Sequence, residues 1–335
     1  MSFEDIKGQD RAIGILTEAI RRMRIFSAYM FVGPDGIGKL AAAKNFAKAV
    51  NCKSRKTHPC EECVSCKKIN SGAHPDVILA EPRLASSSVG IERVRELIAR
   101  ANLKPYEGIR KVFIIDKAHA MTQEAQNSFL KTLEEPPNDT TFILVSRSEA
   151  ALLPTIASRC HVIKFSVAPR SLVKDVLKSK FNIKAAEADI LSNFSSGRIG
   201  EAVRLSEENL IPRKNALLRS LLSGGGDFYK VLSAHTSRRE LKENIEFIIS
   251  FLRDAFLYKA RGTEEGIFNI DKKEDIKTLS EQFECERLDS LIKRLIGLGS
   301  YVDYNVNPKI VIDVLTNELR RYHARSNTGE AARSR

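Results

Sequence analysis

The sequence predicts a parallel α/β domain with helices on both faces of the sheet, followed by all-helical regions. Five short apolar runs alternate with helical patterns up to residue 165, and no further strand-like run follows Pro169. A glycine-rich loop comes directly after the first apolar run. Strands joined by crossover helices form a parallel sheet that is buried on both faces, so they should be apolar along their whole length. The expected strands are residues 28–32, 77–80, 112–115, 142–145 and 161–165.

The helices of the first half are expected between these strands, at residues 40–50, 91–101 and 123–133. Beyond residue 169 the apolar residues recur at helical spacing only. Two groups show this period most clearly: Leu241, Ile245, Ile248, Ile249 and Leu252, and then Leu288, Leu291, Ile292, Leu295 and Ile296. The second half of the chain is therefore predicted to be all-α.

The 335 residues correspond to two or three domains at about 150 residues each. We expect a nucleotide-binding-like domain at residues 1–167, with a cysteine-rich insert at about 52–66. A small helical unit should follow at 168–208 and a larger helical domain at 209–323. The polar segment 324–335 is predicted to be a disordered tail.

The chain carries a formal net charge of +12. Such an excess suggests an anionic partner, such as nucleic acid or nucleotide. The charges are spread along the chain, however, and a solvated basic surface is the alternative explanation. The sequence has no apolar run of about 18 residues and no secretory signal at its N-terminus. These features lead us to expect a cytoplasmic protein without membrane contact.

Four of the six cysteines lie within fifteen residues. Cys52, Cys60, Cys63 and Cys66 form two overlapping Cys-x-x-Cys pairs with a fourth thiol upstream. In a long chain of a reducing compartment this pattern indicates a metal before a disulfide. Four thiolates suit tetrahedral zinc and leave no open position, so the predicted site is structural. His58 could replace one ligand, and an iron–sulfur cluster is the alternative metal group.

The glycine-rich loop contains Gly33, Gly36, Gly38 and Lys39, in the spacing of a phosphate-binding loop. Its backbone amides and the N-terminus of the next helix could hold phosphates, with Lys39 reaching the outer ones. An ATPase has Ser or Thr at the following position to hold magnesium, whereas this chain has Leu40. Either nucleotide binding is retained, or the glycines only shape a turn.

Asp116 ends the apolar run 112–115, where an acid orients magnesium in proteins of this kind. The next residue should be a glutamate that positions the attacking water, but it is Lys117. A lysine cation cannot accept a proton from water at neutral pH. Two departures, Leu40 and Lys117, therefore fall on the two groups that hydrolysis requires.

Three segments closely resemble the bacterial clamp-loader branch of the AAA+ proteins. They are residues 3–9, the segment 121–136 ending in Leu-Glu-Glu-Pro, and residues 153–160 with the sequence Leu-Pro-Thr-Ile-Ala-Ser-Arg-Cys. The segment 305–315 also resembles the last helix of that family. The resemblance covers the whole chain. It implies an AAA+ domain carrying the zinc insert, a helical lid and a helical collar that holds the subunits together.

The family contains motor subunits, gamma or tau, which hydrolyse ATP, and a related stator subunit, which does not. Leu40 and Lys117 favour the stator. Gly200 stands where the lid arginine is expected, and Arg198 comes two residues early. The chain also ends just after the collar, whereas motor subunits often continue. The resemblance therefore implies a subunit that is not itself catalytic, with the nucleotide, ATP or ADP, left open.

Arg159 lies in the segment that resembles the arginine finger of this family, which acts on the ATP of a neighbouring subunit. An arginine suits this role because its planar fork stays charged and can grip phosphate oxygens. A local structural ion pair is the alternative. The implied partners are gamma/tau and delta subunits and, indirectly, the sliding clamp and primer-template DNA. Any DNA contact of this chain would be made to phosphates and would be salt-sensitive.

Two other functions are open at this point. The first is an active ATPase of the gamma/tau type, which requires hydrolysis despite Leu40 and Lys117. The second is a zinc-dependent DNA-binding protein, although no recognition-helix motif is present in the sequence.

Overall fold

A computed structural model describes residues 2–54, 56–82, 88–222, 228–233, 237–304 and 306–330. The contacts divide the chain into two compact units. Unit 1 comprises Met1–Ile183 and Ser195–Val203, and unit 2 comprises Lys184–Phe194 and Arg204–Arg335. Unit 1 holds the sheet, and unit 2 is helical. The predicted separation of a lid at 168–208 does not coincide with this division, and the three-domain organisation stays a prediction.

Unit 1 is built on a five-stranded parallel sheet with the order β2-β3-β4-β1-β5. The strands are β1 (Ala28–Val32), β2 (Val77–Ala80), β3 (Lys111–Ile115), β4 (Thr140–Ser146) and β5 (His161–Lys164). All five predicted strands are present, within two residues at either end. The central strands β1, β3 and β4 are buried at every residue, as expected for a sheet covered on both faces.

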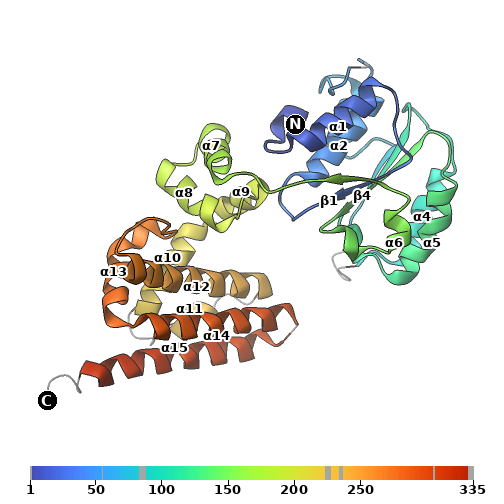
Figure 1. The fold of residues 1–335 in the computed structure, drawn as a ribbon. Helices are drawn as coiled ribbons and strands as arrows, with labels where there is room; N and C mark the ends of the chain where they lie inside the picture. The colour runs from blue at the N-terminus through green and yellow to red at the C-terminus, as the bar shows by residue number, and fades with distance from the viewer. Residues whose placement is uncertain are drawn as a thin grey trace. The chain divides into compact units, whose positions relative to one another are not determined.

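Helices cover both faces of this sheet, with α1 and α2 on one side and α4 and α5 on the other (Figure 1). Alternate residues of a strand point to opposite faces. Phe31 of β1 therefore packs with Phe46 of α2 in one core, while Phe142 of β4 packs with Phe129 of α5 in the other. The helices and 3-10 turns of unit 1 are η1 (Phe3–Asp5), α1 (Asp10–Arg21), α2 (Lys39–Asn51), α3 (Val64–Asn70), α4 (Ile91–Ala101), η2 (Ala118–Ala120), α5 (Gln123–Glu134), η3 (Glu149–Ala151), α6 (Pro154–Ala157) and α7 (Arg170–Phe181).

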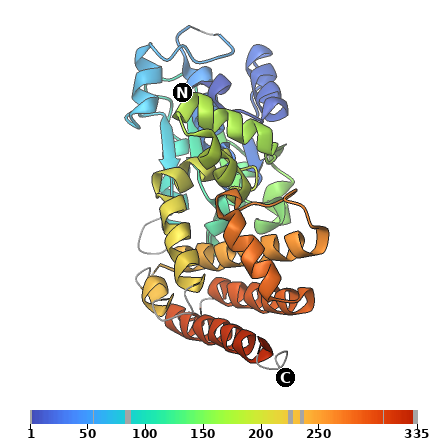
Figure 2. The ribbon, with the colours of Figure 1, turned by 90° about the vertical axis from the view of Figure 1, so that its left-hand side faces the viewer.

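Unit 2 is formed by helices, as the 3.6-residue period predicts. They are α8 (Ala185–Phe194), the last residues of α9 (Ile199–Glu207), α10 (Leu210–Leu222), α11 (Phe228–Ser233), α12 (Arg238–Arg261), the 3-10 turn η4 (Ile270–Lys272), α13 (Lys273–Gln282), α14 (Cys285–Asp303) and α15 (Pro308–Glu330). Helices α12, α14 and α15 pack side by side (Figures 1 and 2). Among the described residues, no helix is both long and apolar enough to span a membrane.

Helix α15 is assigned to Glu330, and the disordered tail expected at residues 324–335 stays a prediction. The polar composition of residues 324–330 does not prevent them from extending a helix that is already nucleated by its packed N-terminal half. Residues 331–335 lie outside the described residues.

Candidate functional site

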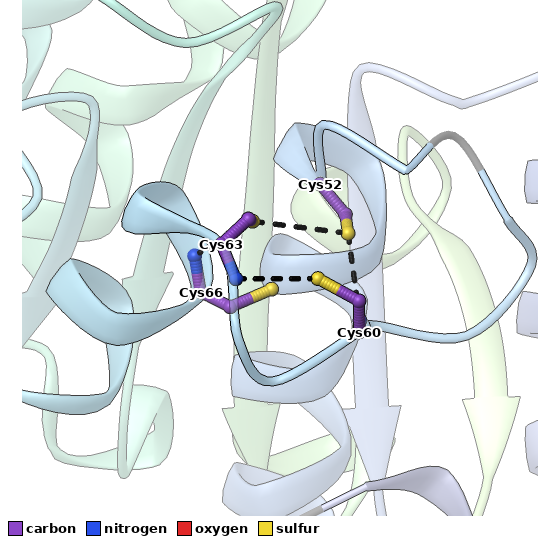
Figure 3. A group of neighbouring side chains, drawn as sticks. All are labelled: Cys52, Cys60, Cys63 and Cys66. Carbon is purple, nitrogen blue, oxygen red and sulfur yellow. Dashed lines mark hydrogen bonds between the residues drawn. The ribbon is translucent and has the colours of Figure 1, made fainter.

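The four clustered cysteines lie where α2 ends and α3 begins (Figure 3). Cys52 is the first residue beyond α2, and Cys60 lies in the loop that follows. Cys63 caps the N-terminus of α3, and its Sγ accepts a hydrogen bond from the backbone N–H of Cys66, at 3.5 Å. The start of α3 therefore fixes the Cys-x-x-Cys spacing of the last two thiols.

The sulfur positions suit a single metal ion. All four Sγ atoms lie within 4.8 Å of one another, and the Sγ atoms of Cys52 and Cys63 are 4.0 Å apart. Sulfurs placed tetrahedrally at about 2.3 Å from zinc would be about 3.8 Å apart. All four are free thiols rather than disulfides. The structure thus brings the four predicted ligands together in a group that could hold a metal.

The loop between these ligands is tied to the surrounding helices. Lys48 of α2, whose side chain is almost fully buried, forms an ion pair with Glu61. The other carboxylate oxygen of Glu61 accepts a hydrogen bond from Asn70 Nδ2, at 2.8 Å. Glu61 itself has φ +63°, a strained conformation for a residue with a side chain. These contacts hold the Cys60–Cys63 turn in place.

The thiols differ in acidity. The backbone N–H groups of Cys63 and Glu62 lower the pKa of Cys60 to about 6, whereas burial raises the pKa of Cys66 above its ordinary value. A bound cation favours the thiolate form of each ligand. Binding of a metal ion would therefore release protons from this group.

The glycine-rich loop joins β1 to α2. Gly33, Gly36 and Gly38 have φ values of +148°, +79° and +97°, which side-chain-bearing residues rarely adopt. A Cβ atom at Gly33 would lie 2.5 Å from the carbonyl oxygen of Phe165. The loop therefore needs its glycines, as the sequence predicted.

Lys39 does not extend into open space above the loop. Its ammonium donates hydrogen bonds to the carbonyl oxygens of Gly33 and Pro34 and lies 3.6 Å from Asp35 Oδ1. Its side chain is 5% exposed. Burial lowers the pKa of Lys39, and the neighbouring Asp35 and Asp116 carboxylates partly oppose this shift. The structure thus brings Lys39 and Asp116 into one electrostatic group.

The two positions at which the sequence departs from an ATPase lie at the start of α2 and after β3. Leu40 packs its side chain against the core of α1, α2 and the sheet. Asp116 follows β3, and its N–H donates to the carbonyl oxygen of Ala80, at 2.9 Å. Lys117 is exposed and has φ +50°. Neither Leu40 nor Lys117 offers an oxygen to a magnesium ion or a base to a water molecule.

Gly200 lies directly against the phosphate loop. Its N–H donates to the carbonyl oxygen of Gly36, at 2.8 Å. A Cβ atom at Gly200 would lie 2.9 Å from that oxygen, which real Cβ atoms do not tolerate. An arginine cannot occupy this position without moving the loop. The structure therefore gives a steric reason why the expected lid arginine is not found at Gly200.

Arg159 lies between α6 and β5 and is held by local contacts. Its Nη2 donates to Glu134 Oε1 at 2.5 Å, and its Nη1 donates to the carbonyl oxygen of Thr155 at 2.9 Å. The Arg159 side chain is 34% exposed and that of Glu134 is 49% exposed. The local ion pair considered from the sequence is therefore present. Pairs this exposed contribute about 0–1 kcal/mol to stability, so the guanidinium can exchange partners at little cost.

The parallel sheet separates Arg159 from the phosphate loop of its own chain. In the pairing of β1 with β5, Tyr29 is opposite His161 and Val32 is opposite Lys164. The loop follows Val32 at one end of these strands, and Arg159 precedes His161 at the other. At about 3.3 Å per residue, the strands put roughly 10 Å between the two ends. Arg159 therefore lies at the end of the sheet opposite to the phosphate loop of its own chain.

Sequence reasoning missed two charged residues beside the phosphate loop. Asp35 Oδ2 accepts a hydrogen bond from Arg147 Nε, at 2.6 Å. Burial and the positive charge of nearby Arg147 lower the pKa of His119, whose Nδ1 has no hydrogen-bond partner among the described residues. The available signals were an acid inside the glycine-rich loop and a cation directly after the strand 140–146.

Unit 2 exposes several large apolar side chains on its last two helices. They are Ile296, Tyr301, Tyr304, Ile310 and Val314. Tyr304 is 79% exposed. All five lie on α14, on α15 or in the turn between them, and they are candidate contact residues of the predicted collar.

The parallel sheet, the glycine loop after β1 and the acid after β3 define a P-loop protein of the AAA+ class. Two family models match the chain: "DNA polymerase III, delta subunit" over residues 8–169, and "DNA polymerase III, delta subunit, C terminal" over residues 208–320. The DNA polymerase III subunit delta' of Bacillus subtilis is 36% identical over 322 residues, covering 93% of this chain and 96% of that protein. The chain belongs to the delta-prime family of DNA polymerase III subunits.

The chain is also similar to proteins named as tau or gamma-related subunits of DNA polymerase III. The DNA polymerase III subunit tau of Bacillus subtilis is 30% identical and is matched over 93% of this chain but 60% of its own length. Among solved structures, a gamma-subunit-related protein of DNA polymerase III from Thermotoga maritima has a TM-score of 0.44 at 16% identity, covering 93% of this chain and 99% of the other.

Proposed function

We propose that the chain is the delta-prime-type stator of the DNA polymerase III clamp-loader complex, a cytoplasmic assembly that loads the sliding clamp onto primed DNA with ATP. In this role it supplies Arg159 to the ATP of a neighbouring subunit. The observation that carries the proposal is the arrangement of the sheet: Arg159 lies at the opposite end from a phosphate loop that lacks the groups for hydrolysis. The chain could therefore supply Arg159 to ATP hydrolysis in a neighbouring subunit, although its own nucleotide site lacks the groups for hydrolysis.

The test of this function is reconstitution. The chain is mixed with gamma/tau and delta subunits, the complex is isolated, and clamp loading on primed DNA is measured. We expect the chain to join the complex and clamp loading to depend on it. Failure of the chain to join these subunits would contradict the proposed function without affecting the fold assignment.

Gly33, Gly36, Gly38, Lys39 and Asp116 then form a degenerate nucleotide site. We expect the purified chain to hydrolyse ATP at no more than the background rate, because Leu40 holds no magnesium and Lys117 activates no water. The measurement is phosphate release, with a purified gamma/tau subunit as the positive control. Turnover at the rate of the motor subunit would instead support the alternative, an active gamma/tau-type ATPase.

The cysteine group is proposed to hold one structural zinc ion through Cys52, Cys60, Cys63 and Cys66. The all-thiol donor set and the near-tetrahedral spacing of the sulfurs support zinc, and four protein ligands leave no position for a substrate. When bound, zinc would join the end of α2 to the start of α3. Metal analysis by mass spectrometry is expected to give one zinc per chain, and an iron–sulfur absorbance would contradict this assignment.

The exposed apolar surface of α14 and α15 is proposed to bind the collar helices of partner subunits. We expect Ile310→Asp to reduce recovery of the reconstituted complex about tenfold, because a buried and unpaired charge is costly at an apolar interface. Lys309→Glu changes a neighbouring exposed residue by two charge units and serves as the control. Gel filtration measures both. Recovery of I310D equal to that of the wild type would rule out this surface.

A further inference from the structure

Asp35 lies within the phosphate loop, between two cations. Its Oδ2 accepts the hydrogen bond from Arg147 Nε at 2.6 Å, and its Oδ1 lies 3.6 Å from Lys39 Nζ. The carboxylate therefore uses both oxygens to bridge a residue of the loop helix and a residue at the end of β4. Partial burial acts to raise the pKa of Asp35, but the Arg147 hydrogen bond and the charges of Arg147 and Lys39 outweigh it and lower the pKa. The bridge is therefore ionised at neutral pH.

The Asp35 carboxylate lies between two cations, as a bound anion would lie in an anion-binding site. Lys39 is the loop residue that would reach the outer phosphates of a nucleotide, and Arg147 is a second cation on the same side of the sheet. Both are charge-compensated by one carboxylate. The Lys39 ammonium also donates to the carbonyl oxygens of Gly33 and Pro34, which leaves its third N–H for the Asp35 carboxylate or for a phosphate.

We propose that Asp35 weakens nucleotide binding at this loop, because its carboxylate lies between Lys39 and Arg147 and competes with the phosphates of nucleoside di- and triphosphates for both cations. A phosphate group entering the loop would meet an adjacent negative charge and would have to displace Asp35 from both cations. The inference rests on the proposed degenerate nucleotide site and deepens it. Leu40 and Lys117 would thus remove hydrolysis, whereas Asp35 would lower the affinity for nucleotide.

The backbone of the loop still has the shape that phosphate binding requires, and this makes Asp35 the deciding residue. The three glycines keep positive φ values, and α2 begins directly at Lys39. The amide groups at the N-terminus of α2 retain the partial positive charge that favours phosphate. Removing the charge of one side chain should therefore recover binding without rebuilding the loop.

The test compares the full-length wild-type chain with Asp35→Asn by isothermal titration with ADP and magnesium. Asparagine keeps the shape of the side chain and removes its charge. We expect the D35N chain to bind ADP at least tenfold more tightly than the wild type. The Asp35 side chain is 43% exposed, so the substitution should not prevent folding, and thermal unfolding without ADP checks this. Asp35→Glu keeps the charge and should bind no better than the wild type.

A second variant tests whether Lys39 is responsible for the added ADP affinity. D35N combined with Lys39→Ala should lose the added affinity, because Lys39 is the cation that the substitution frees. Equal ADP affinity of the wild type and D35N would overturn the proposal, as would a gain that survives K39A. These outcomes are separate from the proposed stator role, which is tested by Arg159 substitutions in the assembled complex. If D35N leaves ADP affinity unchanged while R159A slows ATP hydrolysis by the complex, only the inference about Asp35 is contradicted.

Discussion

Substitution of Arg159 by alanine is expected to slow ATP hydrolysis and clamp loading by the reconstituted complex, while the complex still assembles. An arginine that neutralises charge in phosphoryl transfer can accelerate the step by about 10³-fold or more, which corresponds to about 4 kcal/mol. Only the one ATP site that Arg159 faces should be affected. We therefore expect a large loss in single-turnover hydrolysis at that site and a smaller loss in the total rate of ATP consumption.

Two further variants separate the chemistry of Arg159 from its local ion pair. Arg159→Lys keeps the charge but loses the planar fork, so it should recover only part of the rate. Glu134→Gln removes the partner at 2.5 Å and leaves the arginine intact, so it should retain most of the rate. Loss of activity in E134Q as large as in R159A would show that the ion pair, rather than a phosphate contact, is the function of this residue.

Removal of the metal is the second change with a large expected effect. Cys63→Ser should abolish stoichiometric zinc and destabilise the segment from Cys52 to His74, by an amount on the order of several kcal/mol. Cys63 both caps α3 and supplies a central sulfur of the group. We expect the sheet to stay folded, because its two cores do not include the cysteine loop. Limited proteolysis should then cut within this segment.

The matched control is Cys285→Ser. Cys285 is half-buried at the start of α14 in unit 2, and it is a free thiol like the others. This variant should keep one zinc per chain and the protease resistance of the wild type. A C63S chain with unchanged metal content, or unchanged resistance after zinc is lost, would contradict a structural zinc site at these four cysteines.

The sheet could be predicted closely from the sequence because its strands are buried on both faces. Such strands are continuously apolar, and residues 112–115 and 142–145 carry no polar interruption. The helices between them have marked ends as well. Thr122 caps α5 through its side chain, and Pro136 follows directly after the residue that ends this helix.

The metal ligands could be predicted because they are close in sequence, whereas the charged residues beside the phosphate loop could not. The four cysteines lie within fifteen residues, and their spacing alone brings them together. Asp35 and Arg147 are 112 positions apart, and only the pairing of β1 with β4 brings their strand ends together. The contact of Gly200 with Gly36 is hidden for the same reason.

The role of Arg159 can be tested by single-turnover ATP hydrolysis by a complex of gamma/tau, delta and this chain, with the wild-type chain and with R159A in parallel. We expect that both chains assemble equally, that the chain alone shows no turnover, and that R159A slows hydrolysis at one site by about 10³-fold. Identical hydrolysis and clamp loading by the two complexes would contradict this role.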